Sequence, residues 1–183
     1  MGAGIAYVTA KAGIPVVLID RDMEAAAKGK AHSDNLITDA VKKGRAKPDE
    51  KDRLLSLITP SADYADLEGA DLVIEAVFED SEVKRPATEK AEAALKASAI
   101  FASNPSTIPI TSLAKNSARP KNFIGIHFFS PVDRMMLVEI ILGKKTGDKA
   151  LAAAIDYVRA IKKTPVVVND TRGFYVNRCV LRY

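Results

Sequence analysis

Two residues of this 183-residue sequence have the types and spacing that proton-transfer chemistry needs. His127, one of only two histidines, ends the apolar segment 123–127, and Glu139 lies twelve residues later within the aliphatic segment 137–142. A buried carboxylate is costly unless it is paired, and a carboxylate beside an imidazole fixes the tautomer of a general base. A His–Glu pair is the simplest account of both residues. The alternative is a purely structural histidine, which is common at strand ends.

Other polar side chains also follow apolar segments. They are Asp20, Glu75 with Glu79, and Ser103 with Asn104 and Ser106. In open α/β sheets, ligands bind outside the carboxyl ends of the strands. An acid in the place of Asp20 hydrogen-bonds the adenosine ribose of NAD in dinucleotide-binding βαβ units. These residues are therefore candidates for a binding site.

The elements that must position these residues alternate between two patterns. Short, continuous apolar runs predict buried strands at 15–20, 71–77, 99–103, 123–127, 137–142 and 165–168. Amphipathic or small-residue segments predict helices at 3–12, 23–43, 48–58, 81–95 and 148–161, with Pro86 either marking the first turn of its helix or kinking it. The alternation predicts an α/β fold with a Rossmann-like, doubly wound, mostly parallel sheet.

The N-terminal segment fits the second half of a dinucleotide-binding βαβ unit. Tyr7 stands where a G-x-G-x-x-G motif starting at Gly2 needs its last glycine, so Gly2 is better placed as the final glycine. The first strand would then lie upstream, between the strand ending at Asp20 and the strand 72–77. We expect upstream residues, another copy of the chain or a rearranged sheet to fill that place, and we expect weak NAD binding by the isolated chain.

Composition excludes several classes of protein. No apolar run approaches the roughly 20 residues of a membrane-spanning helix, and the single cysteine, Cys179, rules out internal disulfides and cysteine-based zinc sites. The net charge of +4 is too mild to indicate nucleic-acid binding by itself. Basic residues gather in the helical pair 23–58, as Lys28, Lys30, Lys42, Lys43, Arg45 and Lys47. This helical pair is either a solvated face or a surface for phosphates.

Four motifs together resemble the signatures of NAD-dependent 3-hydroxyacyl-CoA dehydrogenases. They are Ser103-Asn104-Pro105-Ser106, His127-Phe128-Phe129-Ser130-Pro131-Val132, Glu139, and Gly173-Phe174-Tyr175-Val176-Asn177-Arg178. Ser106, His127, Glu139 and Asn177 follow one another at the family's intervals of 21, 12 and 38 residues. The resemblance covers essentially the whole chain. Ser130 and the segment 63–67 are most similar to the dehydrogenase part of multifunctional fatty-acid oxidation proteins.

The resemblance implies a role for each matched residue. His127 would be the general base, Glu139 would orient it, and Ser106 and Asn177 would hydrogen-bond the reacting oxygen. The residues implied to contact NAD are Gly2, Asp20, Glu79, Lys84, Ser106 and Ser130. Those implied to contact the acyl-CoA substrate are Ser106, Asn177 and Lys43. One departure from the family pattern is Pro105, which replaces the usual threonine and stiffens the loop before Ser106.

The resemblance also implies an organisation and an activity. Residues 1–172 would form an NAD-binding domain that is incomplete at its N-terminus, and residues 173–183 would begin a helical C-terminal domain. The implied activity is NAD-dependent oxidation of L-3-hydroxyacyl-CoA to 3-ketoacyl-CoA in fatty-acid β-oxidation, without a metal, nucleic acid or membrane partner. The full-length protein would be a homodimer or part of a larger fatty-acid oxidation complex. It would lie in the bacterial cytoplasm, or in the mitochondrial matrix of a eukaryote.

Two other functions stay open. The chain could be a non-catalytic NAD- or CoA-binding module, since we expect the isolated fragment to be inactive. It could also be a related β-hydroxyacid dehydrogenase with another substrate. Those enzymes typically use lysine as the base, and the pairing of His127 with Glu139 argues against that alternative.

Overall fold

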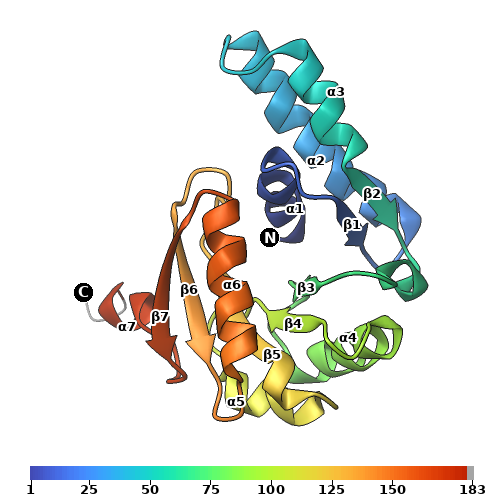
Figure 1. Cartoon of the computed structure of the whole chain (residues 1–183). Coiled ribbons are helices and arrows are strands. Elements are labelled where there is room, and N and C mark those ends of the chain that lie inside the picture. Colours follow the sequence, from blue (N-terminus) through green and yellow to red (C-terminus); the bar gives the residue numbers. More distant parts are fainter. Residues whose placement is uncertain (181–183) are drawn as a thin grey trace. The chain divides into compact units, whose positions relative to one another are not determined.

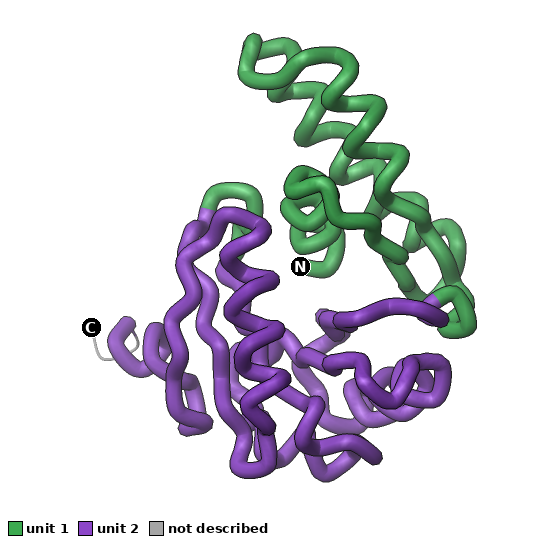
Figure 2. Tube along the Cα trace, viewed as in Figure 1, with its two compact units in different colours: residues 1–66, 130–134 green, residues 67–129, 135–183 purple. Residues whose placement is uncertain are grey.

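The computed structural model describes residues 1–180, which divide into two compact units. Unit 1 comprises Met1–Asp66 and Ser130–Arg134, and unit 2 comprises Leu67–Phe129 and Met135–Tyr183 (Figure 2). Residues 173–180 belong to unit 2, so this division does not follow the boundary expected after residue 172. That boundary concerns a further domain and stays a prediction, and residues 181–183 of the expected segment lie outside the described part.

Unit 1 is a small parallel sheet with three helices. Its elements are α1 (Gly2–Lys11), β1 (Val16–Ile19), α2 (Met23–Lys42), α3 (Pro48–Ser56) and β2 (Ile58–Ser61). Asp22 caps the N-terminus of helix α2, since its side chain accepts the N–H of Ala25 at 2.7 Å and so satisfies a free amide of the first turn. Helix α2 packs closely on β1, because a Cβ on Gly29 would lie only 2.7 Å from Cδ2 of Leu18.

The strand β2 corrects the sequence-based expectation at Ile58. The helix predicted for 48–58 ends at Ser56, and Ile58 instead begins a strand that pairs with β1 in parallel, Val16 opposite Ile58. The sequence of β2 does not indicate a strand, because it contains polar side chains and Pro60. Proline lacks the N–H that a central strand would use. Pro60 is tolerated because β2 has a partner on one side only.

Unit 2 is a five-stranded sheet with covering helices (Figure 1). Its strands are β3 (Leu72–Glu75), β4 (Ile100–Ser103), β5 (Phe123–Phe128), β6 (Leu137–Leu142) and β7 (Thr164–Asn169). Its helices are α4 (Ser81–Ala94), α5 (Ile110–Leu113), α6 (Asp148–Ala160) and α7 (Val176–Val180). Short 3₁₀ turns lie at Ala114–Asn116 and Pro120–Asn122, and a third, Tyr64–Leu67, spans the boundary in the chain between the units. Pro86 lies inside α4, so it does not mark the first turn.

The sheet order is β3-β4-β5-β6-β7, and every neighbouring pair is parallel except β5 with β6. Every residue of β4 and β5 is buried, as predicted for strands that are covered on both faces. Helix α6 packs across β5, β6 and β7 through Ala150, Ala154 and Val158. The observed architecture confirms the predicted Rossmann-like α/β class.

Within the described part of the chain, four strands have a partner on one side only, namely β1, β2, β3 and β7, and two of these, β1 and β3, bear on the strand expected at the N-terminus. Strand β1 pairs only with β2, and strand β3 pairs only with β4. No strand of residues 1–180 pairs with the other side of β1 or of β3, so the rearranged sheet that the sequence left open is not observed within either unit. The other two possibilities, upstream residues and a second copy of the chain, stay predictions.

Candidate active site

His127 and Glu139 are direct cross-strand partners in the antiparallel ladder of β5 and β6. Directly opposed side chains point to the same face of a sheet, so the register brings the imidazole and the carboxylate together. Nδ1 of His127 lies 2.7 Å from Oε2 of Glu139, and both side chains are buried. The predicted contact is confirmed. Its cause is the antiparallel direction of β6, which an apolar run does not reveal.

The second oxygen of Glu139 accepts two backbone hydrogen bonds. Oε1 receives the N–H of Tyr175 at 2.9 Å and the N–H of Val176 at 2.8 Å. The turn that delivers these amides contains two consecutive left-handed residues, Gly173 at φ +78° and Phe174 at φ +50°. A non-glycine residue there costs about 1–2 kcal/mol, so the tertiary structure must hold Phe174 in place.

Two aromatic rings enclose the imidazole. The Phe129 ring centroid lies 4.6 Å from that of His127, and the Phe174 centroid lies 5.6 Å away, both in tilted orientations. Phe174 is 1% exposed. The packing of Phe174 therefore fixes the imidazole and the turn that supplies amides to Glu139.

The ionisation of Glu139 follows from these contacts. Burial raises the pKa of the Glu139 carboxyl, but hydrogen bonds from His127, Val176 and Tyr175 outweigh it and leave the pKa below its ordinary value. An ionised carboxylate accepts the Nδ1–H of a neutral imidazole, so Nε2 carries the free lone pair. The arrangement can take up a proton at Nε2 and stabilise the imidazolium that forms.

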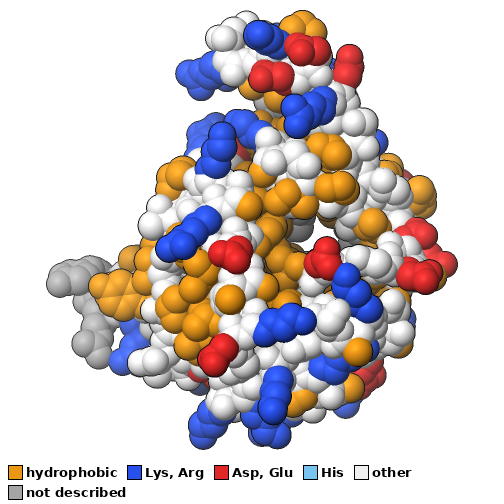
Figure 3. Space-filling model, viewed as in Figure 1, with side chains coloured by type: hydrophobic (Ala, Val, Ile, Leu, Met, Phe, Trp, Pro, Cys, Tyr) orange, Lys and Arg blue, Asp and Glu red, His pale blue; other side chains and the backbone are white. Residues whose placement is uncertain are grey.

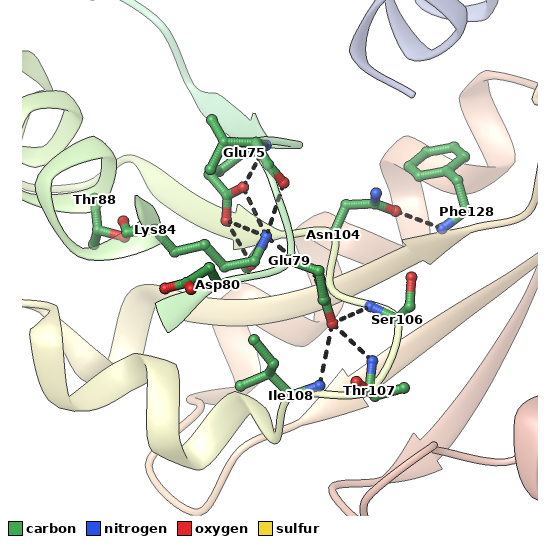
Figure 4. Close-up of polar contacts among 12 residues, drawn as sticks. Glu75, Glu79, Asp80, Lys84, Thr88, Asn104, Ser106, Thr107, Ile108 and Phe128 are labelled. Carbon is green, nitrogen blue, oxygen red and sulfur yellow. Dashed lines mark hydrogen bonds and ion pairs between the residues drawn. The ribbon is translucent and has the colours of Figure 1, made fainter. Parts of the chain in front are cut away.

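The loop after β4 carries Ser106. Asn104 begins this loop, and its Oδ1 accepts the N–H of Phe128 at 2.8 Å, next to His127 at the end of β5. Ser106 is exposed, and its side chain points away from Glu79 (Figure 4). The side chain of Asn177, from α7, donates through Nδ2 to the carbonyl oxygen of Ser106 at 2.8 Å. The structure thus joins two of the predicted site residues directly.

Glu79 holds the same loop from the other side. Its Oε1 accepts the N–H groups of Ser106 at 2.7 Å, Thr107 at 2.8 Å and Ile108 at 3.3 Å (Figure 4). One carboxylate oxygen therefore satisfies three successive backbone donors. Glu79, which is predicted to lie along the cofactor, therefore also stabilises the conformation of this loop.

Lys84 lies inside unit 2. Its ammonium is 2.9 Å from Oε1 of Glu75 and 3.7 Å from Oε2 of Glu79, and its side chain is 1% exposed. Ser103 donates to Oε2 of Glu75 at 2.7 Å. The resemblance implies that Lys84 lies along the cofactor. The ammonium is enclosed by protein groups, and its role toward a cofactor stays a prediction.

Three predicted cofactor residues lie in unit 1. Gly2 is the first residue of α1, and Asp20 is exposed directly after β1, where its Oδ1 accepts the N–H of Arg21 at 2.8 Å. Ser130 is exposed in the segment 130–134, which packs on α1 where Val132 meets Gly4. Their roles stay predictions.

The basic helical pair carries charges of both signs. Lys43 is exposed and caps the C-terminal end of α2. Lys28 pairs with Glu24 at 2.7 Å, and Lys51 pairs with Asp34 at 2.8 Å. Figure 3 shows acidic as well as basic side chains over α2 and α3. The lysines thus show no uniform basic face in this view, and a contact of Lys43 with a phosphate stays a prediction.

Two further carboxylates hold the backbone that follows Ser106. Asp170 accepts the N–H groups of Ile110 and Thr111, both at 2.7 Å, through its two oxygens. Glu92 accepts the N–H of Ala118 at 2.8 Å. Sequence reasoning missed both roles. Asp170 directly follows a strand, the position that singled out Asp20, whereas Glu92 is one of several acids in α4 and carries no distinguishing signal.

Residues 1–180 contain no group of three or more side chains that could hold a metal ion. Among the helices of this part, none has the length and apolar character needed to cross a membrane.

Comparison with known proteins assigns the chain to a family. Residues 1–171 match the family described as 3-hydroxyacyl-CoA dehydrogenase, NAD binding domain. The chain is similar to (S)-3-hydroxybutyryl-CoA dehydrogenase from Ralstonia eutropha, with 37% identity, a TM-score of 0.96, and coverage of 98% of this chain and 64% of that one. For 3-hydroxybutyryl-CoA dehydrogenase from Escherichia coli, the identity is 33%, the TM-score is 0.94, and the coverage is 97% and 38%.

The dehydrogenase part of multifunctional enzyme 1 from C. elegans is also similar, with 29% identity, a TM-score of 0.81, and coverage of 92% of this chain and 38% of that one. The chain spans less than two thirds of the length of each of these three proteins. The family match covers nearly the whole chain, and the fold agrees with it. This protein belongs to the 3-hydroxyacyl-CoA dehydrogenase family, and residues 1–171 are its NAD-binding domain.

Proposed function

We propose that this protein oxidises L-3-hydroxyacyl-CoA to 3-ketoacyl-CoA with NAD, and that this chain carries the groups that handle the proton. The observation that carries the proposal is the buried pair of His127 and Glu139, at 2.7 Å, with Glu139 held by two backbone amides. Two similar proteins are named as 3-hydroxybutyryl-CoA dehydrogenases, which supports an acyl-CoA substrate.

The residues present fit NAD. In unit 1, the Asp20 carboxylate is exposed directly after β1, where it can accept hydrogen bonds from a ribose diol. In unit 2, the hydroxyl of Ser106 is exposed on a loop that follows the carboxyl end of β4. When bound, NAD accepts the hydride that leaves the hydroxyl-bearing carbon of the substrate.

His127 takes the proton of the substrate hydroxyl at Nε2. Because Nδ1–H is committed to Glu139, Nε2 is the basic nitrogen, and the imidazolium that forms lies against an ionised carboxylate. Loss of the proton turns the hydroxyl oxygen into a carbonyl oxygen as the hydride departs. In the reverse direction, the same nitrogen returns the proton.

In this proposal Ser106 and Asn177 bind the reacting oxygen. Asn177 uses Nδ2 to hold the Ser106 carbonyl, so one of its two N–H bonds stays available for a substrate. Holding the reacting carbon in one orientation contributes to the rate because it removes the entropic cost of alignment.

The finer assignments follow from the same activity. The enzyme acts in fatty-acid β-oxidation, with Lys43 contacting a phosphate of the CoA group. It works as a homodimer or within a larger fatty-acid oxidation complex, in the bacterial cytoplasm or the mitochondrial matrix.

The decisive experiment compares the two histidines of the protein, expressed from its complete reading frame. Reduction of acetoacetyl-CoA by NADH is followed for the parent, His127→Gln and the matched control His32→Gln, whose exposed side chain lies on α2. We expect His127→Gln to lower kcat about 100- to 10,000-fold, while the control matches the parent.

Equal activity of His127→Gln and the parent would overturn the assignment of the base. A parent that binds NADH but turns over no hydroxyacyl-CoA or ketoacyl-CoA would indicate the alternative function, a binding module. A parent that prefers a β-hydroxyacid without CoA would indicate the related dehydrogenases.

A further inference from the structure

Lys84 is enclosed in unit 2, and the proposed reaction gives its ammonium no direct task. Nζ lies 2.9 Å and 3.2 Å from the two oxygens of Glu75 and 3.4 Å from the carbonyl oxygen of Val77. A buried ion pair is weak evidence for a role in stability, because apolar side chains of similar volume often serve as well. What distinguishes Lys84 is the second carboxylate beside it, Glu79.

Glu75 fixes the position of the Lys84 ammonium. Its Oε1 also accepts the N–H of Val77 at 2.7 Å, and its Oε2 accepts the hydroxyl of Ser103 at 2.7 Å. Strand β3, strand β4 and helix α4 therefore meet in one hydrogen-bonded cluster (Figure 4). The ammonium is anchored to the sheet and cannot move toward a ligand without breaking these bonds.

Glu79 connects this cluster to the loop of Ser106. Its Oε2 lies 3.7 Å from Nζ of Lys84, while its Oε1 accepts the amides of Ser106, Thr107 and Ile108. The positive charge of Lys84 thus favours one placement of the Glu79 carboxylate. Without that charge, Oε2 of Glu79 loses the attraction of its cation, so nothing in this cluster favours one placement of the carboxylate.

The peptide between Ser106 and Thr107 is held at both ends. Its N–H, from Thr107, donates to Glu79 at 2.8 Å, and its carbonyl oxygen, from Ser106, accepts the Nδ2 of Asn177 at 2.8 Å. Hydrogen bonds at the two ends of one amide polarise it and strengthen each other. A continuous chain of contacts therefore runs from Lys84 through Glu79 and this peptide to Asn177.

We propose that Lys84 is a positioning residue that orients both Ser106 and Asn177, acting through Glu79 and the Ser106–Thr107 peptide. Its effect on the rate rests on the proposed function, whereas its effect on the loop does not. Lys84 sets the direction of the second N–H of Asn177, the one available to a substrate oxygen. It does so through its contacts with protein groups.

The first test replaces the cation in the protein expressed from its complete reading frame. Lys84→Met keeps the length of the side chain and removes the charge. We expect amide hydrogen exchange at residues 106–108 to accelerate about tenfold or more in the ligand-free protein, while β5 stays protected. We expect kcat for acetoacetyl-CoA to fall about 10- to 100-fold, with KM changed less than about threefold. The matched control is Lys96→Met, which removes an exposed lysine paired with Asp71.

The second test separates positioning from folding. In Lys84→Met, the buried Glu75 loses its cation, so stability falls for a reason unrelated to the loop. The double variant Lys84→Met/Glu75→Gln removes that unpaired charge and keeps one oxygen acceptor for the N–H of Val77, while the new amide nitrogen can donate to the hydroxyl of Ser103. We expect its Tm to recover while the exchange at 106–108 stays fast and kcat stays low, because Glu79 still lacks its cation.

Recovery of slow exchange and of kcat together with Tm would overturn the proposal, since Lys84 would then act only on stability. Unchanged exchange at 106–108 in Lys84→Met would also overturn it. If the parent protein turns over no acyl-CoA substrate, the proposed function fails, and the exchange measurements still decide whether Lys84 positions the loop.

Discussion

The two units differ in whether they bury charged side chains. Among the described residues, every buried side chain of an acidic or basic residue lies in unit 2, whereas the buried polar side chains of unit 1 are uncharged. The set in unit 2 is Glu75, Lys84, Glu92, His127, Glu139 and Lys163. The set in unit 1 is Thr9, Ser33 and Ser61. The ion pairs of unit 1, such as Lys28 with Glu24, lie on the surface.

The difference shows what buried charge is used for in this fold. Glu75, Glu92 and Glu139 each accept at least one backbone N–H in addition to their side-chain partners. Each therefore fixes a piece of irregular backbone that hydrophobic packing cannot hold in one register. Exposed ion pairs contribute little to stability, so unit 1 depends on helix–strand packing instead.

Among the changes that compare the two units, the largest expected effect comes from neutralising Glu139, which is fully buried. Glu139→Gln loses the charge that supports the His127 imidazolium, so we expect kcat to fall about 10- to 100-fold. The matched change in unit 1, Glu24→Gln, should leave both activity and unfolding by urea unchanged, because Glu24 is exposed. A Glu139→Gln enzyme as active as the parent would contradict the role of the pair.

The same variant tests the pH dependence of stability. The pKa of the Glu139 carboxyl is below its ordinary value in the folded state, so the unfolded chain binds its proton more readily. The ionised Glu139 carboxylate therefore adds to the free energy of unfolding. This addition is complete above the ordinary pKa, about 4.3, and is lost as the pH falls through the lower pKa of the folded state. Urea unfolding at several pH values should show the parent losing this advantage over Glu139→Gln in that acidic window. If the difference in the free energy of unfolding between the parent and Glu139→Gln stayed constant over these pH values, the lowered pKa of Glu139 would be contradicted.

An intermediate effect is expected from two glycines that allow close packing. A Cβ on Gly125 in unit 2 would lie 2.6 Å from Ile110 and 2.9 Å from the Cβ of Ile141, which cannot move aside. We expect Gly125→Ala to lower the free energy of unfolding by about 1–3 kcal/mol.

Gly29 in unit 1 is the matched position. Its added Cβ would meet only the end of Leu18 closely, and alanine gains about 1 kcal/mol in helix propensity. We expect Gly29→Ala to change the free energy of unfolding little. Chemical denaturation measures the free energy of unfolding of both variants. An equal loss in Gly29→Ala and Gly125→Ala would contradict the expected difference between the two positions.

The smallest effect concerns two buried hydroxyls. Ser33 in unit 1 is completely buried, and its Oγ has no hydrogen-bond partner among residues 1–180. Ser103 in unit 2 donates to Glu75 at 2.7 Å. We expect Ser33→Ala to raise the free energy of unfolding by about 0.5–1 kcal/mol and Ser103→Ala to lower it by about 1 kcal/mol. Thermal unfolding measures both variants, and a change of the same sign in Ser33→Ala and Ser103→Ala would contradict this prediction.

Local sequence patterns were sufficient for most of the fold. The continuous apolar runs before Asp20, Asn104 and Phe128 all became buried or partly buried strands, because such runs can hide both faces only inside a sheet. The strand β2 was missed because Pro60 and its polar neighbours lack that pattern. The direction of β6 was also missed, since strand direction depends on the connection and not on composition.

The candidate site was predictable where a residue type is unusual for its place. A glutamate within the aliphatic segment of β6 needs a partner, and His127 was the available one. Lys84 carried no such signal, because α4 is rich in charged residues and only the tertiary structure encloses this lysine. The three amides bound by Glu79 depend on how the loop folds back, and local spacing does not encode that.

The open edges of β1 and β3 bear on how the isolated chain behaves at high concentration. Both strands are short and consist almost entirely of aliphatic residues, and neither carries a lysine or proline that would discourage an added strand. An unpaired apolar edge is a template for aggregation. We therefore expect that covering the open edge of β3 raises the solubility of the isolated chain without any change to its surface charge. A peptide that adds a parallel strand to β3 would do this, and so would a protein that binds over this edge.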